Sequence, residues 1–532
     1  MLTESPLLIV GAGPVGLTMA CELARHGVRC RIIDKAAARS QTSKALAIFP
    51  RTLEVFETMG VAERILQGGL RLRGICIHNR HEQIAKIEMA TIASPYPFVL
   101  SLPQSETERI LIEQLESLGV SVERARELTG LTQTDTAVHA VIRDESGREE
   151  TIETPWLLGC DGAHSATRHL LSMEFSGAPY DESFVLADVK VDASVSKDEA
   201  NLFFSEEGIF AIIAFTPEYS RIIANIPVES GGQELPDFTL EEIQAIAERR
   251  GPPGLRVSDP IWISRFSISH RIVSEFRIVR VFLAGDSAHI HSPAGGQGMN
   301  IGIQDAFNLA WKLALVVAER APAQLLGSYH IEREPVARGV LNLTDRITRV
   351  ATARNAIVQT ARNIILPVLA GIDFFEEKIA DRLAELAVSY RLSPIVENHG
   401  SGRPRAGDRA PDAELRDANG KACRLFELFR EPYHLLLLFL GATPSNESKA
   451  FQHELTDWLG EVIQVYRITR GRSHNASGDL LDISGNVHSL YHMLTGGVVL
   501  VRPDGYVAFR CDRFDAAKFR NYLTRIFRVA GE

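Results

Sequence analysis

Apolar and polar positions near the start of the chain predict a strand, a helix and a second strand in close succession. Residues 7–10 are four consecutive apolar residues, which is typical of a parallel strand buried on both faces. A helical spacing follows to about His26, and residues 28–33 form a second, largely apolar run. This order predicts a βαβ unit and hence an α/β fold.

Helical spacing recurs at two places before residue 120. Residues 52–56 and 105–118 carry apolar side chains three and four positions apart, which predicts two helices. Ser105 and Glu108 have the spacing of a capping box, so Gln104 is predicted just outside the second helix, where its amide can reach a ligand. Alternation within residues 74–89 predicts strands between the two helices.

From about residue 180 the pattern changes to short alternating segments. They predict strands at residues 184–191, 201–204, 209–215 and 221–227. One helix, predicted over residues 239–248, interrupts them. We therefore predict an antiparallel sheet that forms a separate lobe inserted into the first α/β domain.

The second half of the chain returns to mixed spacing. Residues 280–284 predict a buried strand, and a glycine-dense loop leads into a long helix that reaches about residue 316. Helical spacing over residues 341–376 predicts outer helices, and residues 399–411, rich in Gly, Pro, Arg and Asp, predict a linker. A compact α/β module is predicted beyond the linker, with strands and a closing helix at residues 434–441, 497–502 and 512–529.

The composition excludes several classes of protein. A chain of 532 residues is too long for one hydrophobic core, and a net charge of −10 with scattered Lys and Arg predicts no nucleic-acid partner. The six cysteines lie far apart, without a CxxC or metal-type pair, which favours the reducing cytoplasm. The longest plain apolar run, residues 435–440, is too short to cross a bilayer, so no transmembrane segment is predicted.

Glycine residues stand where the first predicted strand meets its helix. Gly11 permits a tight turn, Gly13 lets a pyrophosphate approach the backbone, and Gly16 lets the helix pack closely on the strand. The free N–H groups at the start of that helix favour a negative group. Asp34, at the end of the second strand, stands where an acid that accepts a ribose hydroxyl is expected. The stretch predicts a dinucleotide site without deciding between NAD and FAD.

Two more predicted strands end beside an acidic residue and a glycine. A buried strand over residues 156–160 leads into Asp161-Gly162, and the strand over residues 280–284 leads into Gly285-Asp286. Open α/β sheets bind ligands at such strand ends. The glycine-dense loop over residues 293–300 would let a flat ring system lie against the backbone, and the helix behind it would stabilise the anionic edge of a reduced flavin. A nicotinamide would gain much less, so this loop favours a flavin.

Together the three motifs resemble those of the class A flavoprotein monooxygenases, the aromatic hydroxylases of the para-hydroxybenzoate hydroxylase fold. The motifs are Gly11-Ala12-Gly13-Pro14-Val15-Gly16, Cys160-Asp161-Gly162-Ala163-His164-Ser165 and Gly285-Asp286-Ser287-Ala288-His289. Residues 41–44, 96–98 and 106–109 resemble the phenol hydroxylase and pentachlorophenol 4-monooxygenase branch. The C-terminal part resembles that branch's thioredoxin-like domain.

The resemblance implies an α/β fold with three parts. A discontinuous Rossmann-type FAD-binding domain with outer helices would comprise residues 1–75, 100–180 and 276–398. A substrate-binding lobe built on an antiparallel sheet would comprise residues 76–99 and 181–275. Residues 399–532 would form a thioredoxin-like domain, whose lack of a CxxC pair argues against a dithiol redox role.

The resemblance also implies which residues hold the cofactor. They are Gly11, Gly13, Pro14, Val15, Gly16, Asp34, Lys35, Lys44, Gln104, Leu128, Asp161, Gly162, Gly285, Asp286, Pro293, Gly295, Gly298, Met299 and Asn300. Lys44 stands where many relatives have Arg, Leu128 would meet the adenine through its backbone, and Arg168 would assist Asp161. The candidates at the reactive edge of the flavin are Pro293, Gly298, Met299 and Asn300. No catalytic base is identified.

The implied reaction is hydroxylation of a phenolic or polycyclic aromatic substrate. NADPH or NADH would reduce FAD, O2 would add to give a flavin C4a-hydroperoxide, and one oxygen atom would pass to the aromatic ring. The chain has no second dinucleotide motif, so the nicotinamide cofactor is expected to bind transiently. The C-terminal module is expected to serve packing or dimerisation, which makes a homodimer an expected assembly.

Alternatives remain open from the sequence. One is a Baeyer–Villiger or epoxidising flavin monooxygenase acting on an aromatic polyketide, and a second is a flavin halogenase, although the four Trp residues stand apart. A plain NAD-dependent dehydrogenase and a non-catalytic flavin-binding scaffold are further alternatives. Phe203, Phe210, Ile212 and Phe215 could line an aromatic pocket or belong to ordinary sheet core, and a structural role is favoured for His289 and His291 over proton transfer.

Overall fold

The computed structural model describes most of the chain. The described residues are 5–79, 82–227, 238–292, 295–351, 380–440, 459–460, 462–470 and 479–528. Pro293 and most of the helical segment predicted over residues 341–376 lie outside these ranges. In the described part, no helix is both long and apolar enough to cross a membrane.

The first sheet is the predicted parallel sheet. From edge to edge its strands are β18 (Arg277–Ile278), β19 (Val281–Leu283), β12 (Leu157–Gly159), β1 (Leu7–Val10), β2 (Cys30–Ile33) and β8 (Val122–Glu123). All neighbouring pairs are parallel except β18 and β19. The strands that end at Val10, Gly159 and Leu283 are therefore adjacent, and the three motifs meet at one edge of this sheet.

Helices cover this sheet because their apolar faces pack into its core. They are α1 (Pro14–Arg25), α2 (Pro50–Thr58), α3 (Ala62–Gly68), α4 (Gln104–Ser117), α5 (Ala166–Leu170), α7 (Gly298–Val317) and α8 (Ser328–Ala351). α1 packs against both α4 and α7, and Leu17, Leu111 and Ile303 from these three helices share one buried cluster. Short 3-10 turns at Gly285–Ser287 and Ala323–Gly327 precede α7 and α8 respectively.

An eight-stranded sheet forms the inserted lobe. Its order is β20 (His289–Ile290), β17 (Arg256–Val273), β13 (Phe175–Asp192), β16 (Tyr219–Pro227), β15 (Gly208–Ala214), β14 (Glu199–Ser205), β5 (Gly74–His78) and β6 (Gln83–Glu88). The prediction of a purely antiparallel sheet is wrong at one point, because β14 pairs with β5 in parallel. Helix α6 (Leu240–Arg250) packs on one face, and its capping box is formed by Thr239 and Glu242.

Two small sheets are also present among the described residues before residue 397. One contains β11 (Glu149–Thr154), β10 (Val138–Asp144) and β9 (Arg126–Gln133), and the other contains β3 (Ala47–Ile48), β7 (Val99–Ser101) and β4 (Leu70–Leu72). The second brings the segment after Lys44 beside the start of α4, since Leu102 and Gln104 donate backbone hydrogen bonds to Leu46 and Ala45.

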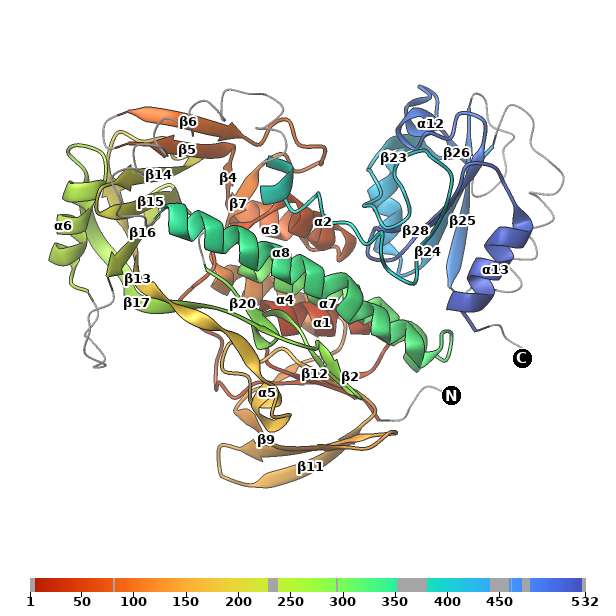
Figure 1. Cartoon of the computed structure of the whole chain (residues 1–532), viewed down its shortest axis with the longest axis horizontal. Coiled ribbons are helices and arrows are strands. Elements are labelled where there is room, and N and C mark those ends of the chain that lie inside the picture. Colours follow the sequence, from red (N-terminus) through yellow and green to blue (C-terminus); the bar gives the residue numbers. More distant parts are fainter. Residues whose placement is uncertain are drawn as a thin grey trace.

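The C-terminal region has its own mixed sheet. Its order is β21 (Glu397–His399), β28 (Val507–Cys511), β27 (Gly497–Val501), β24 (His434–Phe439), β25 (Ile463–Thr469), β26 (Asp479–Leu481), β22 (Glu414–Arg416) and β23 (Ala422–Arg424). Helices α12 (Asn486–Leu490) and α13 (Ala516–Ile526) and a 3-10 turn at Leu425–Arg430 accompany it. In Figure 1 this region, in blue, lies to one side of α7 and α8, while the lobe with α6 lies on the opposite side.

A buried histidine makes the junction between α7 and the C-terminal region sensitive to pH. His434 lies between the rings of Trp311 and Phe527, at centroid distances of 5.2 and 5.1 Å. Burial lowers the pKa of His434 to about 3 from its ordinary value of 6.5, so the folded protein holds a neutral ring. The unfolded chain binds an extra proton below pH 6.5, and stability is therefore lost as the pH falls from about 6.5 towards about 3.

We expect the variant His434→Gln to weaken this pH dependence. The slope of the unfolding free energy against pH should decrease by up to about 1.4 kcal/mol per pH unit, which corresponds to one proton. Urea denaturation between pH 7 and pH 4 measures the slope, and His139→Gln, at a partly exposed side chain on β10, serves as the control. An unchanged slope in His434→Gln would contradict the contribution of His434 to the pH dependence of stability.

Candidate functional site

The turn between β1 and α1 is closed by protein on two sides and open on a third. A Cβ atom on Gly11, whose φ is +100°, would lie 2.4 Å from the Cys160 carbonyl oxygen, and one on Gly16 would lie 1.9 Å from the Gly11 oxygen. A Cβ on Gly13 would meet no protein atom within 4 Å. Gly13 is also the N-cap of α1 and offers no side chain to its free N–H groups. The turn therefore has the open face and the donors that a phosphate group requires.

Asp34 connects this turn to the end of β2. Its Oδ2 accepts a hydrogen bond of 2.7 Å from the Ala12 amide, and its Oδ1 accepts one of 2.8 Å from the Ala36 amide. Arg124 Nη1 lies 3.7 Å from Oδ2. A carboxylate has about four acceptor positions, so Asp34 retains capacity for ribose hydroxyls. Sequence reasoning missed Arg124, which no motif singles out.

The carboxylate of Asp161 is occupied within the protein. It accepts hydrogen bonds from Ser165 Oγ at 2.6 Å and from the amide and hydroxyl of Thr167 at 2.9 and 3.0 Å. Arg168 donates to the carbonyls of Ala163 at 2.8 Å and Ser287 at 3.1 Å. Asp161 therefore caps α5, and Arg168 joins the second motif to the third.

The Gly285-Asp286 turn presents its acid to solvent. Gly285 has a φ of +63°, and its amide donates a 3.0 Å hydrogen bond to Asp305 on α7. A Cβ on Gly285 would lie 2.8 Å from Val15, so the first and third motifs are in contact. Asp286 is exposed beside this contact, in a position to accept hydrogen bonds from a ligand.

The glycine-dense loop is fixed by the side chain of Asn300. Asn300 Oδ1 accepts from the Phe49 amide at 2.9 Å, and its Nδ2 donates to the carbonyls of Ala47 at 2.9 Å and Gly296 at 3.1 Å. Met299 is buried in the main core. α7 has no side-chain cap, so the N–H groups of its first turn, which includes Gly298, have no capping partner. The backbone, rather than the side chains of Met299 and Asn300, is what this loop can offer to a ring.

The capping box predicted at the start of α4 is wrong. The helix begins at Gln104 with Pro103 as its N-cap, and Ser105 forms hydrogen bonds with Ser43 across the chain instead. Gln104 accepts a 3.3 Å hydrogen bond from the Ala45 amide and donates one of 2.9 Å to Glu108. The Pro103 carbonyl accepts the first hydrogen bonds of the helix, from the Glu106 and Thr107 amides, which the Ser-Glu spacing alone did not reveal.

Four other predicted residues occupy different environments. Leu128 is buried beneath β1 and β2, so only its backbone is available to a ligand, as the sequence analysis implied. Lys35 and Lys44 are exposed. Gly162 has a φ of +76°, and a Cβ there would meet nothing within 4 Å.

An ion pair joins the inserted lobe to the segment that carries Lys44. Arg221 Nε and Nη2 each donate a 2.8 Å hydrogen bond to Asp188, and its Nη1 donates one of 3.2 Å to the Lys44 carbonyl. The Arg221 side chain is almost completely buried. No sequence pattern indicates this pair, because its members lie on neighbouring strands, 33 residues apart.

Of the two roles left open for Phe203, Phe210 and Ile212, the structure supports ordinary sheet core. All three side chains lie in the core between the sheet and α6. Successive residues of a strand point to opposite faces, so the neighbouring Ile213 faces the other way and packs with Ala47 and Phe49. Phe215, at the end of β15, stacks with Tyr219 at 6.4 Å instead of joining the α6 cluster.

The structural role favoured for His289 is supported. Its Nε2 lies 2.7 Å from Asp305 Oδ2, and its ring stacks on Phe276 at 5.6 Å. His291 Nδ1 lies 2.9 Å from the Ser292 carbonyl oxygen and therefore acts as the donor. Both rings thus have partners within the protein.

Comparisons with known proteins agree with this geometry. Residues 4–344 match the family described as FAD binding domain, and residues 403–530 match the aromatic-ring hydroxylase C-terminal family. The chain belongs to the FAD-dependent aromatic-ring hydroxylases. The cofactor of this hydroxylase is therefore FAD, which removes the dehydrogenase alternative.

Similar proteins share its whole length. It is 35% identical to 6-methylpretetramide 4-monooxygenase of Streptomyces rimosus over 95% of this chain and 91% of that protein. It is 32% identical to pentachlorophenol 4-monooxygenase of Sphingobium chlorophenolicum over 96% and 95%. The structure of a ternary complex of aklavinone-11 hydroxylase with FAD and aklavinone matches with a TM-score of 0.78 and 25% identity over 98% of each chain. The predicted family and branch are confirmed.

We expect Asp286→Ala to weaken FAD retention by about tenfold, because charge-assisted hydrogen bonds contribute about 1.5–3 kcal/mol each. Asp286 is exposed, so its loss should leave the fold unchanged. The dissociation constant from fluorescence titration of the apoprotein measures the effect. Asp135→Ala, in the loop between β9 and β10, is the control, and a mutant that purifies with full flavin content would contradict the role of Asp286.

Proposed function

We propose that FAD lies across the edge of the first sheet where the three motifs meet. The open face of Gly13 and the uncapped start of α1 would hold the pyrophosphate, and Asp34 with Arg124 would flank the adenosine ribose. Asp286 would bind the ribityl chain, and the first turn of α7 would face the pyrimidine edge of the ring. The contact between Gly285 and Val15 carries this proposal, because it brings the first and third motifs within reach of one ligand.

Bound FAD would accept electrons from NADPH or NADH and supply activated oxygen from O2 for the transfer. The chain's own part is to bind, orient and exclude water. The α7 N–H groups would stabilise negative charge on the ring next to them. Asn300 would keep those groups in place by holding β3 against the loop. The exposed Lys44 would lie over the ring from the segment that Arg221 fixes.

The substrate would lie between this loop and the inner face of the inserted lobe. The strand register places Ile213, Ile223 and Phe266 on that face, and all three are half-buried. An apolar wall of this kind suits a phenolic or polycyclic aromatic ring. One relative is named for a pretetramide and another for a chlorophenol, so both a polycyclic and a single-ring substrate are retained in the proposal.

We also propose the following division of the chain. Residues 1–75, 100–180 and 276–398 form a Rossmann-type FAD-binding domain, residues 76–99 and 181–275 the substrate lobe, and residues 399–532 a thioredoxin-like domain. The parallel order around β1 and the mixed sheet around β24 support the first and third parts, whereas the sheet of the lobe extends beyond its bounds, to Gly74 in β5, Phe175 in β13 and His289–Ile290 in β20. NADPH or NADH would bind only transiently, and a homodimer is the proposed assembly.

Substrate-dependent consumption of NADPH in air tests the function. Phenols, chlorophenols and tetracyclic polyketides would be screened with the FAD-loaded protein, and products would be analysed by mass spectrometry. Hydroxylation requires a product that has gained one oxygen atom. A ring-expanded lactone would indicate Baeyer–Villiger chemistry, and NADPH oxidation yielding only hydrogen peroxide with every compound would contradict a hydroxylase for these substrates.

A further inference from the structure

Asp305 is a buried acid that supports the Gly285-Asp286 turn from behind. Its Oδ2 accepts hydrogen bonds from the Gly285 amide at 3.0 Å and from His289 at 2.7 Å, and its Oδ1 accepts one of 2.6 Å from Arg333 Nε. Burial alone would raise the pKa of Asp305, but Arg333 and His289 lower it below its ordinary value. The residue is therefore a carboxylate with three fixed donors, and it does not reach the ligand side of the turn.

Arg333 connects this carboxylate to two further elements. It lies on α8 and is fully buried. Its Nη2 donates a 3.0 Å hydrogen bond to the Ile301 carbonyl in the first turn of α7, and its Nη1 donates one of 2.8 Å to the Tyr390 hydroxyl. One guanidinium thus determines the position of Asp305 and of the helix end that faces the proposed ring.

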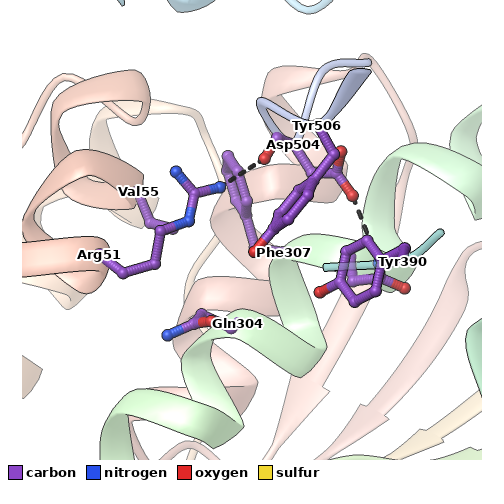
Figure 2. Close-up of a pocket in the computed structure, with 8 residues that line it drawn as sticks. Arg51, Val55, Gln304, Phe307, Tyr390, Asp504 and Tyr506 are labelled. Carbon is purple, nitrogen blue, oxygen red and sulfur yellow. Dashed lines mark hydrogen bonds between the residues drawn. The ribbon is translucent and has the colours of Figure 1, made fainter. Parts of the chain in front are cut away.

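Tyr390 in turn contacts the C-terminal region. Its ring lies 4.3 Å from the ring of Tyr506, which follows the turn at residues 502–505, and its amide donates a 2.7 Å hydrogen bond to the Gly407 carbonyl. Tyr390, Tyr506 and Asp504 line a small cavity together with Arg51 and Gln304 from the first domain, as Figure 2 shows. Contacts therefore run without a gap from Tyr506 through Tyr390, Arg333 and Asp305 to the Gly285 amide.

We propose that Asp305 and Arg333 are positioning residues for the FAD site, and that the C-terminal domain holds them in place through Tyr506 and Tyr390. The inference rests on the FAD site proposed above. It assigns the C-terminal domain a part in cofactor binding, since without that domain Tyr390, an acceptor of Arg333, would lose the Tyr506 ring and the Gly407 carbonyl that hold it. Buried charges with fixed partners have few alternative arrangements, which is why they can hold a turn in one position.

The variant Tyr390→Phe tests the proposal. It removes one acceptor of Arg333 and retains the ring that stacks on Tyr506. We expect the FAD dissociation constant to rise about fivefold and the visible absorption bands of the bound flavin to shift, because the Gly285-Asp286 turn loses its fixed position.

A matched control is available within the C-terminal domain. Tyr522 is also buried, and its hydroxyl donates a 2.9 Å hydrogen bond to the Ile395 carbonyl outside the chain of contacts. Tyr522→Phe should lower the melting temperature about as much as Tyr390→Phe while leaving FAD affinity and the flavin spectrum unchanged. Equal FAD affinity in both variants and the wild type, or an equal loss in both, would overturn the proposal.

A second variant addresses the C-terminal side directly. Tyr506→Leu keeps an apolar side chain but removes the ring against Tyr390, and we expect about a threefold rise in the FAD dissociation constant. The effects of Tyr506→Leu and Tyr390→Phe should be non-additive, because both act on Arg333. Strict additivity, or no effect of Tyr506→Leu, would exclude the C-terminal contribution. A wild-type protein that binds no FAD would instead reject the site itself.

Discussion

Gly13→Val should yield a folded protein that purifies without colour. A Cβ at position 13 meets no protein atom within 4 Å, and the Gly13 φ of −79° is accessible to any residue. The valine side chain would instead fill the face where the pyrophosphate is proposed to lie. We expect FAD affinity to fall by more than about 100-fold, since the phosphate loses both its space and the α1 amides. Absorbance near the flavin bands and circular dichroism measure flavin content and folding separately.

Variants of two other glycines serve as controls for Gly13→Val. Gly339, on α8, also has open space around a Cβ, so Gly339→Val should bind FAD normally. Gly16→Val should fail to fold, because its Cβ would lie 1.9 Å from the Gly11 oxygen. Normal flavin content in Gly13→Val would contradict the placement of the pyrophosphate, whereas an unfolded Gly13→Val protein would contradict the open face.

Arg502→Met should cost about 3–5 kcal/mol of unfolding free energy, because it leaves buried charges without their partner. Arg502 is fully buried and donates to Glu332 at 2.6 and 3.0 Å and to Asp504 at 2.9 Å. Burial would raise the pKa of Glu332, but Arg502 and Lys312 hold it well below its ordinary value. Urea denaturation of the FAD-loaded protein would give the loss.

An exposed pair provides the comparison. Arg525 donates a 2.6 Å hydrogen bond to Glu397, but its side chain is about half exposed (51%). Arg525→Met should therefore cost at most about 1 kcal/mol. If the two variants lost similar amounts of unfolding free energy, Arg502 would contribute no more than an exposed ion pair. That result would contradict a buried charge network around Glu332.

Local sequence was sufficient to predict the structure wherever backbone geometry requires one residue type. Gly11 and Gly285 adopt positive φ values, and a side chain on either would collide with a neighbouring element. Buried apolar runs predicted β1, β12 and β19 because strands covered on both faces need no polar positions. The three motifs could therefore be recognised in the sequence, and so could the family that combines them.

Periodicity could not decide which face of a strand meets a ligand. Phe210 and Ile213 are equally apolar, and only the presence of α6 on one face of the sheet assigns Phe210 to the core. A strand pattern gives the alternation of its side chains but not the identity of either neighbour. For this reason the sequence left both the pocket and the core open for Phe210, and the structure places it in the core.

The α/β fold and the dinucleotide turn followed from the sequence because each depends on residues close together in the chain, and the flavin chemistry followed from the resemblance of three short motifs to those of one family. The tertiary structure decided the partners of the buried charges. Arg502 and Glu332 are 170 residues apart. Asp305, Gly285 and Arg333 lie on three separate elements and are joined by hydrogen bonds. A buried charge is stabilised by whichever group folding brings beside it, and no local spacing records that choice.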